Sequence, residues 1–306
     1  MSPLNPTRGS EEDAPFVEIA HIDELWLQVG GTLCNLTCRH CFISCHPGNR
    51  NFGFLSLADV RRYLVEAAKL GVKEYYLTGG EPFLNRELID ILEAILEVGP
   101  TTVLTNATVL PEKTVRRLVE LSNAARYSLE LRVSIDGYSP ETNDPIRGEG
   151  TFELAMRGLR TLVEAGLLPI VTVAQTWPEN ETATVFDRFV ATLRSWGYER
   201  PRLKILPTLR IGAEAERNRP YEEEERVTER MMEGYPRESL LCSRARIVTD
   251  RGVAVCPILI EAPDAHLGST LAESLRPYRI RHGACYTCYQ YGAICSNFAP
   301  SGREAS

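Results

Sequence analysis

The feature that most constrains this chain is the uneven placing of its cysteines. The segment CNLTCRHCFISCHP, residues 34–47, contains four of the nine cysteines. A disulfide scaffold would cross-link the chain along its whole length, so two separate local groups favour two metal sites. The other five cysteines all lie in the last third of the sequence, at Cys242, Cys256, Cys285, Cys288 and Cys295.

The spacing of the first group is compatible with three kinds of centre. Cys38 and Cys41 could form one half of a zinc site, since structural zinc is bound by such closely spaced pairs. All four cysteines could instead surround a closed iron–sulfur cluster, because Cys38, Cys41 and Cys45 followed by Pro47 partly match a ferredoxin sequence. In the third arrangement Cys34, Cys38 and Cys41 bind three irons of a [4Fe–4S] cluster and leave the fourth iron open.

Composition excludes several other classes of protein. The 306 residues are 43% apolar and 25% charged, as in a soluble globular protein, and the net charge of -7 provides no basic excess for binding a nucleic acid. No stretch approaches the ~20 apolar residues of a membrane span, and residues 1–15 lack the apolar centre of a signal peptide. We therefore expect a cytoplasmic protein, in which reducing conditions favour metal-bound cysteines over disulfides.

Residues 23–206 alternate between strand and helix patterns. Six such units predict a parallel sheet with right-handed crossovers, in the form of an open, partial (β/α)6 barrel of the TIM type. The loops that follow the strands would then line one common cavity. The expected strands are residues 24–30, 74–78, 101–105, 128–136, 169–176 and 202–207, and the expected helices are residues 56–71, 86–97, 112–121, 152–165 and 184–196.

These elements suggest four parts of the chain. We expect a flexible tail over residues 1–21 and the partial barrel over residues 22–207. A linker with some helix would occupy residues 208–238, and a small cysteine-rich domain would occupy residues 239–306.

The motifs that follow the expected strands closely resemble the radical S-adenosylmethionine (SAM) superfamily over residues 24–207. They are C-x3-C-x2-C, TGGEP, TNA and SIDG, in that order. The resemblance implies that Cys34, Cys38 and Cys41 hold a [4Fe–4S] cluster whose open iron binds SAM. It also implies an oxygen-sensitive enzyme that takes an electron from a flavodoxin or ferredoxin, cleaves SAM to a 5′-deoxyadenosyl radical and abstracts a substrate hydrogen atom.

The same resemblance implies a set of SAM-binding residues. A carboxylate suits the ammonium group of SAM, and glycines let the backbone come close to it. Polar side chains at the strand ends would contact the ribose and the carboxylate, although the same residue types also cap turns and helices. The implied residues are His40, Phe42, Gly79, Gly80, Glu81, Asn106, Ser134, Asp136 and Arg147.

The second cysteine group resembles the Twitch or SPASM extension found on many enzymes of this superfamily. The resemblance implies one auxiliary [4Fe–4S] cluster bound by Cys242, Cys256, Cys285 and Cys288, with Cys295 as an alternative ligand. Too few cysteines remain for two further fully ligated clusters. Zinc is the alternative metal, since four thiolates suit either.

Three functions follow from this interpretation. The first is the oxidation or rearrangement of a small metabolite, helped by the auxiliary cluster, and the second is the maturation of a peptide or protein side chain. The third is an iron–sulfur electron carrier without SAM turnover, in which Cys45 closes the first cluster. The substrate candidates are Cys45, which could instead be a buried structural thiol, and the basic residues Arg202, Lys204 and Arg210.

Overall fold

A nine-stranded sheet forms the centre of the molecule in the computed structural model, which describes residues 13–292 and 294. Its strand order is β10-β9-β8-β2-β3-β4-β5-β6-β7. Neighbouring strands from β8 to β7 are parallel, and β9 and β10 add to the β8 edge in antiparallel fashion. The strands are β2 (Glu24–Gly30), β3 (Glu74–Gly79), β4 (Thr101–Thr105), β5 (Leu129–Ser134), β6 (Ile170–Gln175), β7 (Arg202–Pro207), β8 (Ala245–Thr249), β9 (Gly252–Ala254) and β10 (His266–Gly268).

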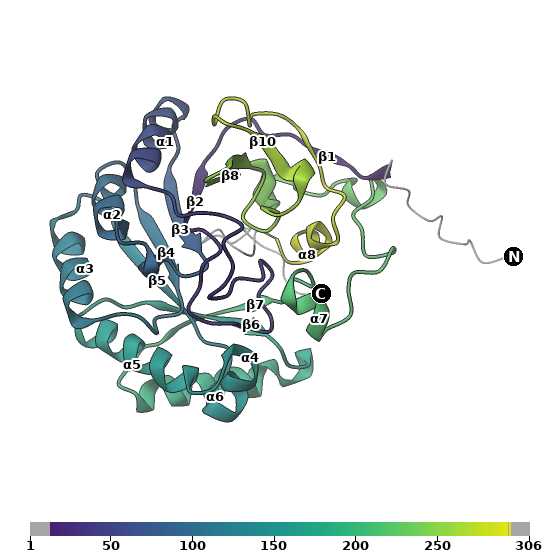
Figure 1. Ribbon diagram of the computed structural model, residues 1–306. Helices are drawn as coiled ribbons and strands as arrows, with labels where there is room; N and C mark the ends of the chain where they lie inside the picture. Colours follow the sequence, from purple (N-terminus) through teal and green to yellow (C-terminus); the bar gives the residue numbers. More distant parts are fainter. Residues whose placement is uncertain (1–12, 293, 295–306) are drawn as a thin grey trace, which may run out of the picture.

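The helices between residues 57 and 195 connect the parallel strands and lie along the outer side of the curved sheet (Figure 1). The first of them shows how the sequence sets their ends: Ser56 and Asp59 form a capping box, and Gly71 ends the helix in the left-handed conformation. The helices are α1 (Leu57–Leu70), α2 (Leu88–Leu96), α3 (Glu112–Ala124), α4 (Pro140–Arg147), α5 (Thr151–Glu164), α6 (Thr182–Ser195), α7 (Ala213–Arg217) and α8 (Gly283–Tyr291).

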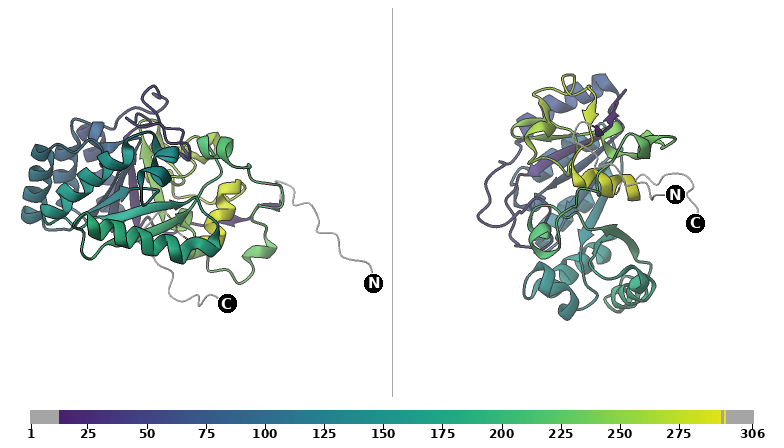
Figure 2. Two further views of the ribbon diagram at one scale, coloured as in Figure 1. Left: turned by 90° about the horizontal axis from the view of Figure 1, so that it is seen from below. Right: turned by 90° about the vertical axis from the view of Figure 1, so that its right-hand side faces the viewer.

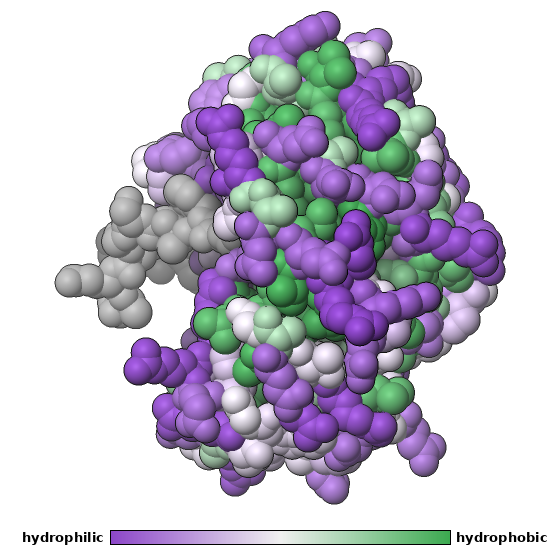
Figure 3. Space-filling view, turned by 90° about the vertical axis from the view of Figure 1, so that its left-hand side faces the viewer, coloured by the Kyte–Doolittle hydropathy of each residue, from purple (hydrophilic) through white to green (hydrophobic). Residues whose placement is uncertain are grey.

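Two hydrophobic clusters fill the two sides of the sheet. The first joins the outer side of the sheet to helices α1, α2, α3, α5 and α6. The second lies between the inner side and the C-terminal segments, and it contains five of the cysteines. Figure 2 shows these C-terminal segments gathered beside the strands, away from α2 and α3, and Figure 3 shows hydrophilic side chains spread over the opposite, helical face with apolar ones between them.

The structure confirms the parallel sheet and all six expected strands, with small shifts at their ends. It differs from expectation in three places. Helix α4 was not expected. Strand β1 (Phe16–Val17) lies within the expected tail and pairs with the distant strand β11 (Tyr278–Arg279). Strand β8 joins the main sheet beside β2. The four expected parts of the chain stay a prediction, because one sheet includes strands from two of them.

None of the helices within the described residues combines the length and the apolar character needed to cross a membrane.

Candidate functional site

A cavity of about 240 Å³ lies at the carboxyl ends of the parallel strands. In parallel α/β folds this edge of the sheet carries the binding site. Most of the residues expected to bind the cluster and SAM line this cavity, namely Cys34, Cys38, His40, Cys41, Phe42, Gly79, Gly80, Asn106, Ser134, Asp136 and Arg147. Their common position is the geometry that the order of the motifs predicts.

Polar groups approach two of the three cysteines that we call the first cysteine site (Cys34, Cys38 and Cys41). The amide Nδ2 of Asn106 lies 3.8 Å from the Cys34 Sγ, and the guanidinium Nη1 of Arg147 lies 4.0 Å from the Cys38 Sγ. Burial raises the pKa of the Cys34 thiol to about 11 and that of Cys38 to about 12, and Arg147 opposes the shift at Cys38.

The third cysteine of the first site has a different neighbour. The backbone amide of Cys45 donates to the Cys41 Sγ at 3.3 Å. A hydrogen bond from the Cys45 side chain lowers the pKa of Cys41 to about 6, against the effect of burial. Cys45 also lines the cavity. Its hydrogen bond to Cys41 and its burial raise the pKa of the Cys45 thiol. Cys45 therefore lies where a substrate in the cavity could reach it, although its direct contact in the structure is with Cys41.

Asp136 organises the opposite side of the cavity. Its carboxylate contacts His40 Nε2 at 2.7 Å and Arg147 Nε at 2.5 Å, and it accepts a hydrogen bond from the Ala174 amide at 2.7 Å. Burial alone would raise the pKa of Asp136, but Arg147 and His40 hold it well below its usual value. The sequence resemblance implied that each of these residues contacts SAM, and it did not predict their contacts with one another. The unexpected helix α4 carries Arg147 in its last turn.

Glu81, which is expected to bind the SAM ammonium group, has partners within the protein, and its role toward SAM stays a prediction. Its side chain is fully buried and accepts hydrogen bonds from Thr105 Oγ1 at 2.7 Å, the Asn106 amide at 2.8 Å and the Phe83 amide at 3.1 Å. Burial raises its pKa despite these donors. Glu81 is not among the cavity-lining residues, because both carboxylate oxygens are engaged in holding the end of β4.

Gly80 lines the cavity where the first two strand ends meet. A Cβ atom on Gly80 would lie 2.0 Å from the carbonyl oxygen of Leu33, so no larger residue fits. Its amide donates to the Gly31 carbonyl at 2.8 Å. Close packing of the cysteine loop on the next strand therefore explains this glycine without any ligand.

The basic substrate candidates lie outside the cavity lining. Arg202 pairs with Glu130 at 2.6 Å on the exposed end of β7. Arg210 pairs with Glu225, and its guanidinium lies 4.4 Å above the ring of Tyr221. Lys204 lies on β7 but does not line the cavity either. None of these three residues therefore lines the cavity: Arg202 and Arg210 pair with nearby glutamates, and Lys204 lies on β7 away from the cavity lining.

Several cavity residues were not anticipated from the sequence. Arg132 and Thr172 lie on β5 and β6, and Trp26 lies on β2 with its ring stacked 4.3 Å from that of Tyr76. Alternation along the strands was the available signal, since residues two positions before a strand end face the same side as the end itself. Pro257 also lines the cavity, and it directly follows Cys256.

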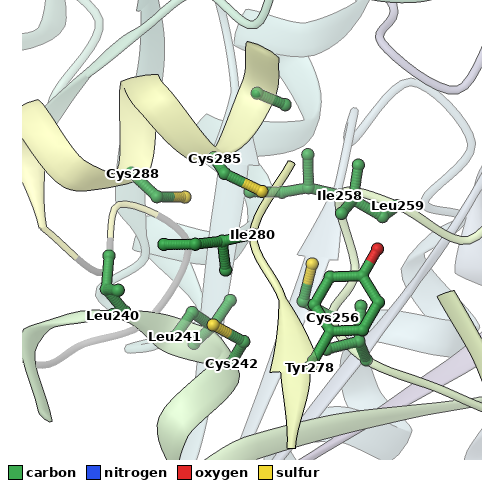
Figure 4. A pocket seen from close by; sticks show the side chains of 12 residues that line it. Leu240, Leu241, Cys242, Cys256, Ile258, Leu259, Tyr278, Ile280, Cys285 and Cys288 are labelled. Carbon is green, nitrogen blue, oxygen red and sulfur yellow. The ribbon is translucent and has the colours of Figure 1, made fainter. Parts of the chain in front are cut away.

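The other four described cysteines line a second, apolar cavity and form the second cysteine site (Cys242, Cys256, Cys285 and Cys288). Figure 4 shows the four side chains around this cavity, two of them from α8. Tyr278 also lines this cavity, and the remaining lining residues are all apolar, namely Leu240, Leu241, Val255, Ile258, Leu259, Ile280 and Ala284. Burial raises the pKa of Cys242 to about 12 and that of Cys285 well above its usual value. Cys295 lies outside the described residues.

The donor set of the second cysteine site fits an iron–sulfur cluster. Four thiolates complete the coordination of a [4Fe–4S] cluster, as they do for zinc. A single zinc ion with Zn–S bonds of about 2.3 Å would hold the sulfurs close together, whereas a cluster binds each thiolate to a different iron. Across residues 13–292 and 294, no three His, Cys, Asp or Glu side chains are close enough to hold one ion. The donor set itself suits either centre.

The fold and the first cysteine site together define an iron–sulfur enzyme of the parallel α/β class. The sequence profile of the Radical SAM superfamily matches residues 29–182, which is half of the chain and includes all three cysteines of the first site. The chain belongs to the Radical SAM superfamily, and it is an enzyme.

Two named relatives each match more than half of the chain. Mycofactocin maturase MftC of Mycobacterium tuberculosis is 32% identical over 169 residues, which cover 53% of this chain and 41% of that protein. A GTP 3′,8-cyclase of Mannheimia succiniciproducens is 29% identical over 184 residues, covering 59% of this chain and 52% of the cyclase. The chain thus matches about half the length of these relatives.

Solved structures resemble a larger part of the fold. Streptococcus suis SuiB bound to the precursor peptide SuiA has a TM-score of 0.63 at 16% identity, covering 84% of this chain and 65% of SuiB. The AdoMet-bound anSMEcpe has a TM-score of 0.60 at 16% identity, covering 82% of this chain and 76% of that protein. At this identity the comparison establishes a shared fold.

Proposed function

We propose that this enzyme cleaves SAM reductively at the first cysteine site and oxidises a small metabolite with the help of an auxiliary [4Fe–4S] cluster at the second. The observation that carries the proposal is that the two sites adjoin. Pro257 lines the cavity of the first site, and the residue before it, Cys256, lines the cavity of the second. A substrate in the larger cavity would therefore lie beside both centres, within a sheet that we interpret as a partial barrel.

When bound, the cluster and SAM supply a carbon-centred radical that removes a hydrogen atom from the substrate. The chain's own residues hold and shield these groups. Cys34, Cys38 and Cys41 would bind three irons, while Arg147 and Asn106 donate toward the sulfurs. Asp136 fixes the direction in which Arg147 presents its remaining N–H groups to the cavity.

The lining beyond the polar groups suits an uncharged part of a substrate. Trp26, Leu104, Leu206 and Leu209 form an apolar wall that excludes water from the reacting atoms. A closed, water-poor wall keeps solvent and other small molecules away from a reactive intermediate.

The release of 5′-deoxyadenosine tests the central step. Protein reconstituted with iron and sulfide without oxygen should produce it from SAM and dithionite, and a Cys38→Ala variant should produce none. A fully loaded protein that releases no 5′-deoxyadenosine would contradict the proposal and favour an electron carrier. Spectroscopy of the first cluster with and without SAM provides an independent check.

A second candidate function is the maturation of a peptide side chain. The similarity to mycofactocin maturase favours it. Extract from source cells grown in heavy water distinguishes the two candidates, because deuterium abstracted from the substrate is found in the 5′-deoxyadenosine. Transfer that survives protease digestion of the extract supports a metabolite, and transfer lost on digestion supports a peptide.

A further inference from the structure

Arg246 is a fully buried cation that lies beside the second cysteine site. Its side chain on β8 has no exposed surface. All four of its hydrogen bonds end on backbone carbonyls: Nη1 donates to Cys242 at 2.8 Å and to Ala245 at 2.8 Å, Nε donates to Ser274 at 3.0 Å, and Nη2 donates to Arg276 at 3.3 Å.

A carboxylate normally accompanies a buried arginine. Two residues earlier, Arg244 follows this rule, with Nη2 placed 2.6 Å from Oε1 of the buried Glu24. Within the described part of the chain, Arg246 forms no ion pair with an Asp or Glu. A guanidinium removed from water is unfavourable unless an opposite charge compensates it.

The second cysteine site adjoins the Arg246 guanidinium. Arg246 donates to the backbone carbonyl of Cys242. Burial lowers the pKa of its guanidinium to about 10, and ionised Cys242 and Cys256 would oppose that shift. Four thiolates leave a bound [4Fe–4S] cluster with a net negative charge, and reduction by one electron adds another. In an apolar cavity that charge interacts strongly with a neighbouring cation.

We propose that Arg246 is the counter-charge of an auxiliary cluster held by the second cysteine site, and that it raises the reduction potential of that cluster. This inference rests on the auxiliary cluster of the proposed function. Arg246 is a positioning residue: it touches no substrate and no iron, and it acts through its charge and its hold on the Cys242 carbonyl. Its cation stabilises the reduced cluster more than the oxidised one, because the reduced cluster carries the larger negative charge.

The test uses the full chain with Cys34, Cys38 and Cys41 replaced by alanine, so that only the second cysteine site binds iron. Dithionite supplies the electron, and electron paramagnetic resonance measures the reduced cluster at fixed solution potentials. Arg246→Met should lower the ratio of reduced to oxidised cluster at least tenfold, equivalent to ~59 mV for a one-electron couple. Arg246→Lys keeps the charge and should stay within about threefold of the parent.

Arg244→Lys is the matched control, since it changes a partly buried arginine that has its own carboxylate partner. It should leave the ratio unchanged. A loaded Arg246→Met variant with the parental ratio would overturn the inference. If Arg246→Met fails to bind iron while Arg246→Lys binds it, the charge is required for assembly and the inference stands; if both fail, the guanidinium hydrogen bonds alone shape the site and the inference is wrong.

Denaturant unfolding with and without iron separates a charge effect from a packing effect. Arg246→Met should destabilise the loaded protein more than the iron-free protein, because both lose the hydrogen bonds to the backbone carbonyls and only the loaded form also loses the charge interaction. Equal destabilisation of both forms would indicate an ordinary structural role. A parent variant that binds no iron at all would refute the auxiliary cluster itself, which is a different failure from an unchanged potential in a loaded protein.

Discussion

The two cysteine sites differ in what surrounds their sulfurs. The first presents three thiols to a cavity of about 240 Å³ that is also lined by Asn106, Asp136, Arg147 and other polar groups. The second presents four thiols to a smaller cavity whose other lining residues are apolar, except for Tyr278. Polar groups near the first site point toward sulfur, whereas the second site has the buried cation Arg246 behind one ligand.

Under the proposed function, this difference gives the two sites different roles. Three thiolates leave one iron of a cluster for an exchangeable ligand, and the polar lining provides donors and acceptors to orient that ligand. Four thiolates in an apolar cavity exclude such a ligand, so the second site is suited to hold or pass an electron. The segment between them, residues 208–225, contacts both sites and connects them physically.

The largest expected effect concerns iron content. The loaded wild-type enzyme should contain about eight irons, and replacing either set of ligands by alanine should leave about four. The measurement is iron analysis of anaerobically reconstituted, desalted protein. Cys45→Ala is the matched control and should keep about eight irons. Loss of the first cluster in Cys45→Ala would show that a fourth thiolate closes that cluster.

The next effect comes from the buried charges of the first site. Asp136→Asn leaves the cation of Arg147 without its partner and should lower the free energy of unfolding by about 3–5 kcal/mol. Because the folded protein holds the pKa of Asp136 low, this stabilisation is present above the unfolded value near ~4 and is lost as the pH falls below it. Denaturant titration at a series of pH values from pH 7 down to about pH 2 measures both.

The second cysteine site provides the comparison for this variant. Asp136→Asn should also weaken SAM binding, while the electron paramagnetic resonance spectrum of the second cluster should be unchanged. A variant that alters both clusters equally would mean that the two sites do not fold and function separately.

Much of this organisation follows from the sequence alone, for identifiable reasons. Strands β2 to β7 alternate with amphipathic helices, and clear caps such as Ser56 and Gly71 mark the ends of α1. The strand-end motifs then share one edge of the sheet, so most of their residues line one cavity. These features depend on local patterns, which a sequence displays directly.

Other features depend on contacts between distant segments and were missed. The short β8 joins β2 although more than two hundred residues separate them, and no local pattern specifies a neighbour. Glu81 fits a ligand-binding role by motif, but the amides and hydroxyl that surround it are known only from the folded structure. Pro145 lies inside α4. Because proline disfavours the interior of a helix, residue propensities did not predict this helix.

A smaller effect is expected where the linking segment meets the first site. Gly212 has φ of 58°, and a Cβ there would lie 2.5 Å from the carbonyl oxygen of Phe42. Gly212→Ala should cost about 1–3 kcal/mol and should slow SAM cleavage, because the adjacent Ala213 amide binds the Cys41 carbonyl at 3.0 Å. Gly234→Ala is the control, with φ of 70° but no atom within 4 Å of its Cβ. Equal losses of stability and of SAM cleavage in both variants would show that backbone strain alone causes the effect.

The smallest effect is expected where the same segment meets the second site. The hydroxyl of Tyr221 lies 2.6 Å from Thr287 Oγ1, between the two cysteines of α8. The same hydroxyl accepts a longer hydrogen bond of 3.3 Å from the Arg210 amide. Tyr221→Phe removes both and should cost about 0.5–1.5 kcal/mol for each hydrogen bond lost. The loss should appear as faster release of iron from the second site to a chelator, with the first cluster unaffected. Tyr198→Phe removes a hydrogen bond of 2.7 Å to the Pro169 carbonyl, far along the chain from both cysteine groups, and should not change either rate. Faster release from both sites in Tyr221→Phe would show instead that residues 208–225 couple the two clusters.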